Sequence, residues 1–189
     1  DAWRPQVNGV VRTLEKLGET LAEMGVAMDV LSPSGFRTLP MPSYPEIRVA
    51  LATPRRVARL IDRHAPDRIH IATEGPLGLL ARRFCIRRGL AFTTSYHTRF
   101  PEFLRARLPV PESWSYRWLR RFHNAGNAVL VATPSLGEEL SARGFANIRL
   151  WTRGVDTGLF HPKRRIDPGL PRPVFLNVGR VAVEKNLPA

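Results

Sequence analysis

Segments with apolar residues at helical spacing alternate along this chain with short, nearly continuous apolar runs. The first helical segment follows Asn8, and its apolar residues recur three or four positions apart: Val10, Leu14, Leu17, Leu21 and Met24. Asn8 suits the N-cap position, so we expect a helix to begin there. The apolar run 26–31 (VAMDVL) then ends at a Ser-Pro-Ser-Gly turn and predicts a buried strand.

The same alternation continues as far as residue 151. Short apolar runs predict strands over 47–51, 68–72, 91–95, 128–132 and 148–151. Helical spacing, with a proline near each start, predicts helices over 54–64, 73–88 and 133–143 and a further helix that starts at Pro111. The proline-rich segment 40–45 predicts a loop. Strands and helices that alternate without an internal repeat indicate an α/β fold with a doubly wound parallel sheet.

A change of composition near residue 163 divides the chain. Residues 163–172 (KRRIDPGLPR) are polar and contain two prolines, and the apolar run 173–178 (PVFLNV) predicts a new strand after them. We therefore expect a first domain over 1–162, a linker over 163–172 and the start of a second domain over 173–189. No apolar run precedes the helix near Asn8, so we expect the first strand of the first domain to lie before residue 1.

The composition is that of a globular protein with an unusual charge. No apolar run approaches the roughly 18 residues of a membrane span, and no signal peptide is evident. The single cysteine, Cys85, excludes an internal disulfide, and these features favour a reducing, cytoplasmic compartment. The 29 Lys and Arg against 16 Asp and Glu give a net charge of +13, nearly all from arginine. Such a surface favours partners that carry phosphate.

Two predicted helices carry candidate surfaces. The helix 54–64 contains four arginines, which form either a solvated face or a cationic surface for an anionic membrane or an acidic acceptor: Arg55, Arg56, Arg59 and Arg63. The helix that starts at Pro111 carries Trp114, Trp118 and Phe122 at four-residue spacing. Such a stripe is more often core, but Trp114 and Trp118 among arginines also suit a membrane or acceptor surface.

Three positions fall where the predicted strands end, which is where doubly wound sheets bind their ligands. Glu74 follows the strand 68–72, and His97 follows the strand 91–95. Asn8 and Gly9 form a helix start whose first N–H groups would be unpaired and could meet an anion. Asn8 is also consistent with an ordinary capped helix, and a lone histidine such as His97 often bonds a neighbouring carbonyl. The position of His97 favours a functional role.

Four motifs stand in one order along the chain: PQVNGVVRTL (5–14), TSYHTRFPEF (94–103), WTRGVDTGLFHP (151–162) and VGRVAVEKN (178–186). With them the chain resembles glycosyltransferase family 4, retaining enzymes of the GT-B fold, in which two Rossmann-like domains face each other across a cleft. The first motif is similar to that of bacterial GDP-mannose-dependent alpha-mannosyltransferases and of lipid glycosyltransferases such as the sulfoquinovosyl transferases. The resemblance implies an acceptor-side Rossmann-like domain followed by the start of a donor-binding domain.

The resemblance implies four residues that bind the donor diphosphate. Gly9 and Asn8 would let the first helix's N–H groups meet the diphosphate or the acceptor. Arg180 and Lys185 match the basic pair of the family's G-R-x(n)-E-K-N segment, which neutralises the leaving diphosphate. Physical chemistry supports that role, because glycosyl transfer builds negative charge on the departing nucleotide. Without a metal, Arg, Lys and helix N-termini must meet this charge.

The resemblance also implies residues that line the cleft. His97 would lie beside the transferred sugar as the catalytic residue, and Arg153 and Asp156 would lie at the interdomain edge with Glu74 at the strand ends. One part of the family pattern is absent. The E-x7-E pair, whose carboxylates support the donor sugar and the ribose, belongs to a later part of the second domain than this sequence reaches. We therefore expect the fragment alone to be inactive.

Three hypotheses of function follow. In the first, the protein moves a hexose, with mannose favoured, from a nucleotide-diphosphate sugar, with GDP-mannose favoured over a UDP-sugar, to a lipid or glycan acceptor. The transfer would retain configuration and need no metal or other cofactor, in the cytoplasm or peripherally on the inner face of the plasma membrane. A sulfoquinovosyl or glucosyl lipid transferase is the alternative within the family. The other hypotheses are a sugar-nucleotide epimerase of the same fold and a basic nucleic-acid-binding protein, although no helix-turn-helix, RRM or zinc pattern occurs.

Overall fold

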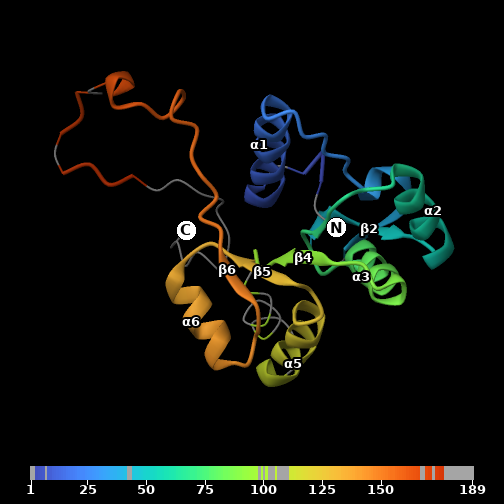
Figure 1. Cartoon of the computed structure of the whole chain (residues 1–189). Coiled ribbons are helices and arrows are strands. Elements are labelled where there is room, and N and C mark those ends of the chain that lie inside the picture. The colour runs from blue at the N-terminus through green and yellow to red at the C-terminus, as the bar shows by residue number, and fades with distance from the viewer. Residues whose placement is uncertain are drawn as a thin grey trace. The chain divides into compact units, whose positions relative to one another are not determined.

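The computed structural model describes residues 3–6, 8–41, 44–97, 99, 101, 105, 111–166, 169–171 and 173–176. The chain divides into two compact units, 1–152 and 153–189. The first unit holds both sheets and all the α-helices named below (Figure 1). The second contains the 3₁₀ helix η2 (Pro162–Arg164). Because residues 177–189 lie outside the described part, the predicted second domain stays a prediction.

A four-stranded parallel sheet forms the centre of the first unit. Its strands are hydrogen-bonded in chain order: β3 (Ile69–Ile71), β4 (Phe92–Ser95), β5 (Ala128–Val131) and β6 (Ile148–Leu150). The helices α3 (Pro76–Arg88), α5 (Glu112–His123) and α6 (Pro134–Ala142) lie between consecutive strands in the sequence. The predicted α/β fold with a parallel sheet is confirmed, and the bounds differ from the predicted ones by only a few residues.

The helices pack on the sheet through contacts that the sequence pattern prepares. Helix α6 contacts β5 and β6, and α3 contacts both β3 and α2 (Pro54–His64). Helices α2 and α6 begin in the same way, with a threonine N-cap before a proline at the first position. The hydroxyl of Thr53 accepts from the N–H of Arg56, and that of Thr133 accepts from the N–H of Leu136.

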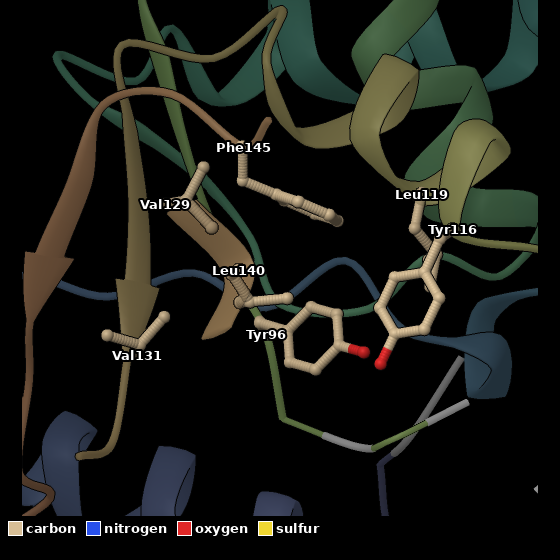
Figure 2. Packing of buried hydrophobic residues seen from close by; sticks show 7 residues of the cluster. All are labelled: Tyr96, Tyr116, Leu119, Val129, Val131, Leu140 and Phe145. Carbon is tan, nitrogen blue, oxygen red and sulfur yellow. The ribbon is translucent and has the colours of Figure 1, made fainter. Parts of the chain in front are cut away.

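The main hydrophobic cluster lies between the sheet and helices α5 and α6 (Figure 2). It consists of buried residues from the strands, from both helices and from the loop that follows α6: Tyr96, Tyr116, Leu119, Val129, Val131, Leu140 and Phe145. The hydroxyl ends of Tyr96 and Tyr116 point toward one another in Figure 2. Leu119 and Leu140 are fully buried, so truncating either to alanine should cost about 2–5 kcal/mol of stability.

Helix α1 (Gly9–Glu23) begins where the pattern predicts. Asn8 is its N-cap, and the side-chain Oδ1 of Asn8 accepts hydrogen bonds of 3.0 Å from the N–H groups of both Val10 and Val11. Val11 and Leu14 are buried, which confirms one apolar face of the amphipathic pattern. Met24, by contrast, caps the carboxyl end of the helix and is 71% exposed.

Two predictions near the amino-terminal end are wrong. The run 26–31 is not a strand; among the described residues no neighbouring strand pairs with its backbone, and Val26 and Val30 are exposed. The predicted loop 40–45 instead belongs largely to an antiparallel hairpin of β1 (Arg37–Met41) and β2 (Tyr44–Leu51). Pro40 is tolerated there because a two-stranded sheet consists only of edge strands.

Candidate functional site

The carboxyl ends of the parallel strands form the candidate site. Parallel strands end at one edge of the sheet, where ligands of α/β folds bind. Three predicted or newly observed side chains follow these ends closely: Glu74 after β3, His97 after β4 and Trp151 after β6. The structure therefore gives Glu74 and His97 the strand-end positions that the sequence predicts, although their roles stay predictions.

Strand β4 presents alternate residues to opposite faces of the sheet. Phe92, Thr94 and Tyr96 face α5, since Phe92 and Tyr96 belong to buried clusters and the hydroxyl of Thr94 lies 2.9 Å from Nδ1 of His123. Thr93 and Ser95 face the other way, toward His70 on β3. The face of the sheet away from α5 thus carries the polar side chains of His70, Thr93 and Ser95. The face toward α5 holds the buried His123.

On the face of the sheet away from α5, His70 is hydrogen-bonded through both ring nitrogens. Its Nδ1 lies 2.8 Å from the hydroxyl of Thr93, and its Nε2 lies 2.9 Å from the hydroxyl of Ser95. Neighbouring atoms remove the ring from bulk water and lower the pKa of His70 to about 4, although the residue keeps an exposed surface. The direction of this shift favours a neutral imidazole at physiological pH.

Trp151 joins His70 to His97. The Trp151 ring lies edge-on to His70 with centroids 6.2 Å apart, and its centroid is 6.1 Å from that of His97. His97 is half-buried. The strand-end cluster, defined as His70, Thr93, Ser95, His97 and Trp151, therefore comprises two imidazoles, two hydroxyls and an indole. The His70 nitrogens are bonded to the two hydroxyls and Ser95 is buried, so the partly exposed rings of His97 and Trp151 are what the cluster offers to a polyhydroxylated ligand.

On the opposite face, Glu74 is held by a buried histidine. The Nε2 atom of His123 lies 3.0 Å from Oε1 of Glu74, and a carboxylate only accepts, so the imidazole N–H donates while Glu74 is ionised. His123 is fully buried at the end of α5, whereas the side chain of Glu74 is 21% exposed. Glu74 is thus oriented at the strand end with part of its surface open to solvent.

Close packing fixes the loop that carries Glu74. Gly78, in the first turn of α3, lies against the carbonyl of Thr73, and a β-carbon at position 78 would overlap that oxygen. A side chain there would force α3 away from the loop. The opposite holds for Gly9, where a β-carbon would meet nothing within 4 Å. Of these two glycines, Gly78 is the one that packing requires.

The start of α1 differs from the prediction in one respect. Its first N–H groups were expected to be unpaired, but the Asn8 side chain accepts from both Val10 and Val11, and the N–H of Arg12 bonds the Asn8 carbonyl. The cap occupies these donors because an N-cap side chain reaches the N2 and N3 amides of its own helix. An anion that bonds the N–H groups of Val10 and Val11 would have to replace this cap.

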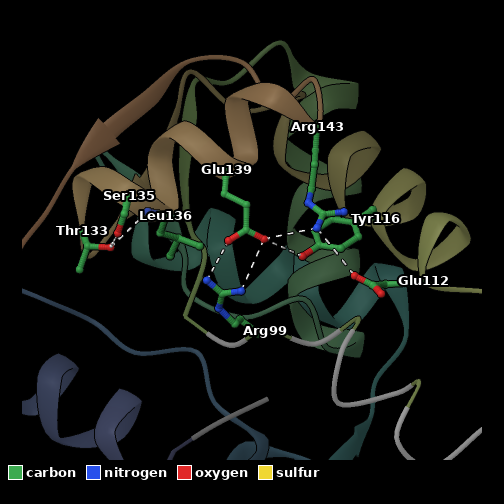
Figure 3. A network of polar contacts seen from close by, with 8 residues as sticks. All are labelled: Arg99, Glu112, Tyr116, Thr133, Ser135, Leu136, Glu139 and Arg143. Carbon is green, nitrogen blue, oxygen red and sulfur yellow. Dashed lines mark hydrogen bonds and ion pairs between the residues drawn. The ribbon is translucent and has the colours of Figure 1, made fainter.

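A polar network lies beside the segment that follows His97 (Figure 3). Arg99 Nη2 donates to Glu139 on α6 at 2.8 Å, and Arg143 lies 3.4 Å from the other Glu139 oxygen. The Arg143 guanidinium also lies over the ring of Tyr116, 3.8 Å from its centroid. The network connects Arg99 to α5 and α6. It is not evident from sequence, because its members are far apart along the chain.

The predicted surface residues are divided by the structure. Arg55, Arg59 and Arg63 are exposed on α2. Arg56 instead donates to the carbonyl of Gly35 at 2.6 Å, and its guanidinium lies 4.7 Å from the Phe36 ring centroid. Arg56 is exposed as well but helps to dock α2 on the segment before β1, and the cationic surface of α2 stays a prediction.

The two tryptophans on α5 are exposed. Trp114 is 64% and Trp118 is 41% exposed, which excludes the core interpretation of the aromatic stripe for these two. Phe122, in contrast, is buried. Exposed indoles are compatible with the membrane or acceptor surface that the sequence suggests.

The remaining predicted site residues lie in the second unit or outside the described residues. Asp156 Oδ1 accepts from the N–H groups of Gly158 and Leu159 at 3.0 and 2.9 Å, so it closes the turn after Arg153. Arg153 has a left-handed φ of 59°. Arg153 and Asp156 belong to the second unit, and their role at the cleft stays a prediction. Arg180 and Lys185 lie outside the described residues.

The described residues contain neither a metal-binding cluster nor a membrane-spanning helix. No three His, Cys, Asp or Glu side chains in that part of the chain lie together in a way that could hold a metal ion. None of the described helices combines the length and hydrophobicity that a membrane span requires.

Comparison with known proteins places this geometry in a family. Residues 7–159 match the model of Glycosyltransferase Family 4. The chain is 30% identical over 81% of its length to "Sulfoquinovosyl transferase SQD2" of Arabidopsis thaliana, and 28% identical over 99% of its length to a "GDP-mannose-dependent alpha-mannosyltransferase" of Mycobacterium tuberculosis. A protein of the same name from Corynebacterium glutamicum is 26% identical over 99% of the chain. The chain spans 32%, 56% and 51% of the lengths of these three relatives. Since the family match covers nearly all of the first unit, including the helix start at Asn8 and the strand end at His97, this chain belongs to glycosyltransferase family 4.

Proposed function

We propose that the protein containing this chain transfers a hexose, with mannose favoured, from GDP-mannose to a lipid or glycan acceptor and retains the configuration of the sugar. The observation that carries this proposal is the similarity over 99% of the chain to relatives named GDP-mannose-dependent alpha-mannosyltransferase. Membership of the family favours this hypothesis over an epimerase or a nucleic-acid-binding protein. The strand-end cluster supports the proposal because it offers the partly exposed, adjacent rings of His97 and Trp151 for contact with a sugar.

The proposed chemistry assigns a task to each of the predicted site residues. His97 contacts the transferred sugar and supports charge that develops at the reacting carbon. Arg180, Lys185 and the start of α1 meet the negative charge on the leaving diphosphate, so the mechanism needs no metal ion. Glu74 is oriented by His123 and accepts a hydrogen bond from the acceptor or the sugar. Arg153 and Asp156 border the cleft between the domains.

A sulfoquinovosyl or glucosyl transferase is the second candidate. It is favoured by the 30% identity to the sulfoquinovosyl transferase, although that match covers only 81% of the chain. The two candidates differ in donor, since one uses GDP and mannose whereas the other would use a UDP-sugar. A competition between donors therefore separates them.

The proposed location is the inner face of the plasma membrane, with peripheral binding. Arg55, Arg59 and Arg63 are exposed on α2, and each cation near an anionic surface adds on the order of 1 kcal/mol of binding. Exposed Trp114 and Trp118 offer amphipathic rings. We therefore propose a lipid-linked acceptor that the enzyme meets at the membrane.

The test uses the complete protein that contains this chain. It is incubated with membrane lipid extract and radiolabelled GDP-mannose, UDP-glucose or UDP-sulfoquinovose, in buffer with and without EDTA. We expect transfer from GDP-mannose alone, undiminished by EDTA, to a product whose anomeric configuration by NMR matches the donor. Transfer from a UDP-sugar alone would support the second candidate, and no transfer from any donor would contradict the proposal.

A further inference from the structure

Arginines from two helices converge on one groove of the first unit. The groove, of about 210 Å³, lies between α2 and α3, which pack against each other. Its volume exceeds that of several water molecules at about 30 Å³ each, so it has room for a phosphate group. Its lining includes four arginines, Arg55, Arg83, Arg87 and Arg88, and apolar residues such as Leu80 and Phe84.

Three of these arginines, Arg55, Arg83 and Arg87, are available for an anion. Arg88, which also borders the groove, is held by Asp62 at 3.2 Å and lies over the Phe84 ring. Arg55, Arg83 and Arg87 are exposed, and among the described residues no carboxylate lies within ion-pair distance of them. Guanidinium groups stay charged at neutral pH, so their convergence is unfavourable until an anion neutralises it.

The surface beside the groove is apolar. Leu79 and Ile86 are 39% and 49% exposed on α3, one turn before and one turn after Arg83. Leu90, just beyond the helix, is 43% exposed. A cationic groove next to exposed aliphatic side chains matches an amphiphile better than a freely soluble anion.

We propose that the groove between α2 and α3 binds the phosphate of an anionic phospholipid headgroup, with Leu79 and Ile86 entering the boundary between headgroups and acyl chains. Arg83 and Arg87, one turn apart on α3, grip the phosphate through paired N–H groups, and Arg55 approaches it from α2. This inference rests on the membrane contact proposed above. It moves that contact from the exposed side of α2 to a discrete site shared with α3.

Co-sedimentation of the complete protein with phosphatidylglycerol vesicles, in 0.15 M salt (about the physiological ionic strength), tests the site. The groove variant is Arg83→Gln with Arg87→Gln, and the matched control is Arg59→Gln with Arg63→Gln, which removes the same charge from exposed positions outside the groove lining. We expect the groove variant to weaken binding at least about threefold more than the control, because both lose the same charge but only the groove variant loses the paired contacts to the phosphate.

A second double variant distinguishes a discrete phosphate site from diffuse electrostatic attraction to the membrane. Arg83→Lys with Arg87→Lys keeps the charge but removes the planar guanidinium fork. A phosphate site should still weaken by about fivefold, whereas a diffuse contact should be unaffected. All the substituted positions are exposed, and thermal unfolding checks that each variant folds.

Four results would overturn the inference. An equal loss in the groove variant and its control would leave the membrane contact of α2 standing but remove the discrete site. Unchanged binding of both variants would contradict the site and the membrane contact together. Unchanged binding of the lysine variant would show that only charge matters. Binding of glycerol 3-phosphate without any binding of vesicles would make the ligand a soluble phosphate ester.

Discussion

The carboxylate of Glu74 lies 3.0 Å from Nε2 of His123, although the two residues are 49 positions apart. The bond joins the loop after β3 to the end of α5, and the contact of His123 with Thr94 extends it to β4. His123 is fully buried, so its partners replace water. The imidazole of His123 thus connects α5 to strand β4 and to the loop after β3.

We expect His123→Ala to destabilise the fold. Removing the imidazole leaves the hydroxyl of Thr94 and the carboxylate of Glu74 without this partner and opens a cavity, so the loss should be at least about 1–3 kcal/mol. Urea unfolding measures it. His64→Ala is the control, because His64 makes a similar bond to Asp29 in an exposed pair, worth within about 1 kcal/mol. Equal losses in the two variants would contradict the importance of the buried bond.

The second prediction concerns His97. In the complete enzyme, His97→Ala should lower kcat by more than about tenfold, which corresponds to roughly 1.4 kcal/mol of lost transition-state stabilisation. Stability should change little, because the side chain is only half-buried and touches Trp151 at one side. Steady-state kinetics with a saturating donor measures kcat. An unchanged kcat in a variant of normal stability would remove His97 from the reaction.

The third prediction concerns donor binding. Replacing Arg180 or Lys185 by Ala should weaken binding of the nucleotide by about 2 kcal/mol if the charge-assisted bond to the diphosphate is removed from water. Titration calorimetry of the complete protein with GDP and UDP measures this. Arg153→Ala serves as the control, since the cleft edge should affect the diphosphate less. Equal affinity in parent and variants would locate the diphosphate elsewhere.

The fourth prediction is a dependence of stability on pH. The pKa of His70 is lowered in the folded state from 6.5 to about 4, so the unfolded chain takes up a proton at a higher pH than the folded one. The contribution of neutral His70 is therefore complete above pH 6.5 and is lost as the pH falls from 6.5 toward 4. Urea unfolding at pH 7 and pH 4.5 should show a smaller difference for His70→Gln than for the parent. The same difference in both proteins would contradict the predicted direction.

Local sequence signals predicted most of the fold. The helix starts could be predicted because Asn8, Thr53 and Thr133 cap their own helices, and such a cap contacts only residues within four positions. The parallel strands were readable because buried strands form short apolar runs. The run 26–31 resembles them in composition, but a strand requires a partner, and none of the described strands pairs with it. The predicted strand 47–51 lies within β2, but its partner β1 was missed because Pro40 indicates a loop, although an edge strand accepts a proline.

The candidate site was less predictable. Position alone indicated His97 and Glu74, since both follow a predicted strand. His70 and His123 gave no such signal: one lies inside a strand and the other at the end of a basic helix. The alternation along β4 could have indicated that Thr93 and Ser95 share a face, but their pairing with His70 depends on the register between strands. Such contacts arise only when distant segments meet.

The cap at the start of α1 makes ligand binding there an exchange of acceptors. The amide oxygen of Asn8 already holds the N–H groups of Val10 and Val11, so a ligand that takes them gives up a cap worth about 1 kcal/mol. A neutral hydroxyl is no better an acceptor than the amide that it would displace. A phosphate oxygen is stronger, because charge roughly doubles the strength of such a bond. We therefore expect the helix start to bind charged ligands in preference to neutral sugars, before any basic side chain takes part.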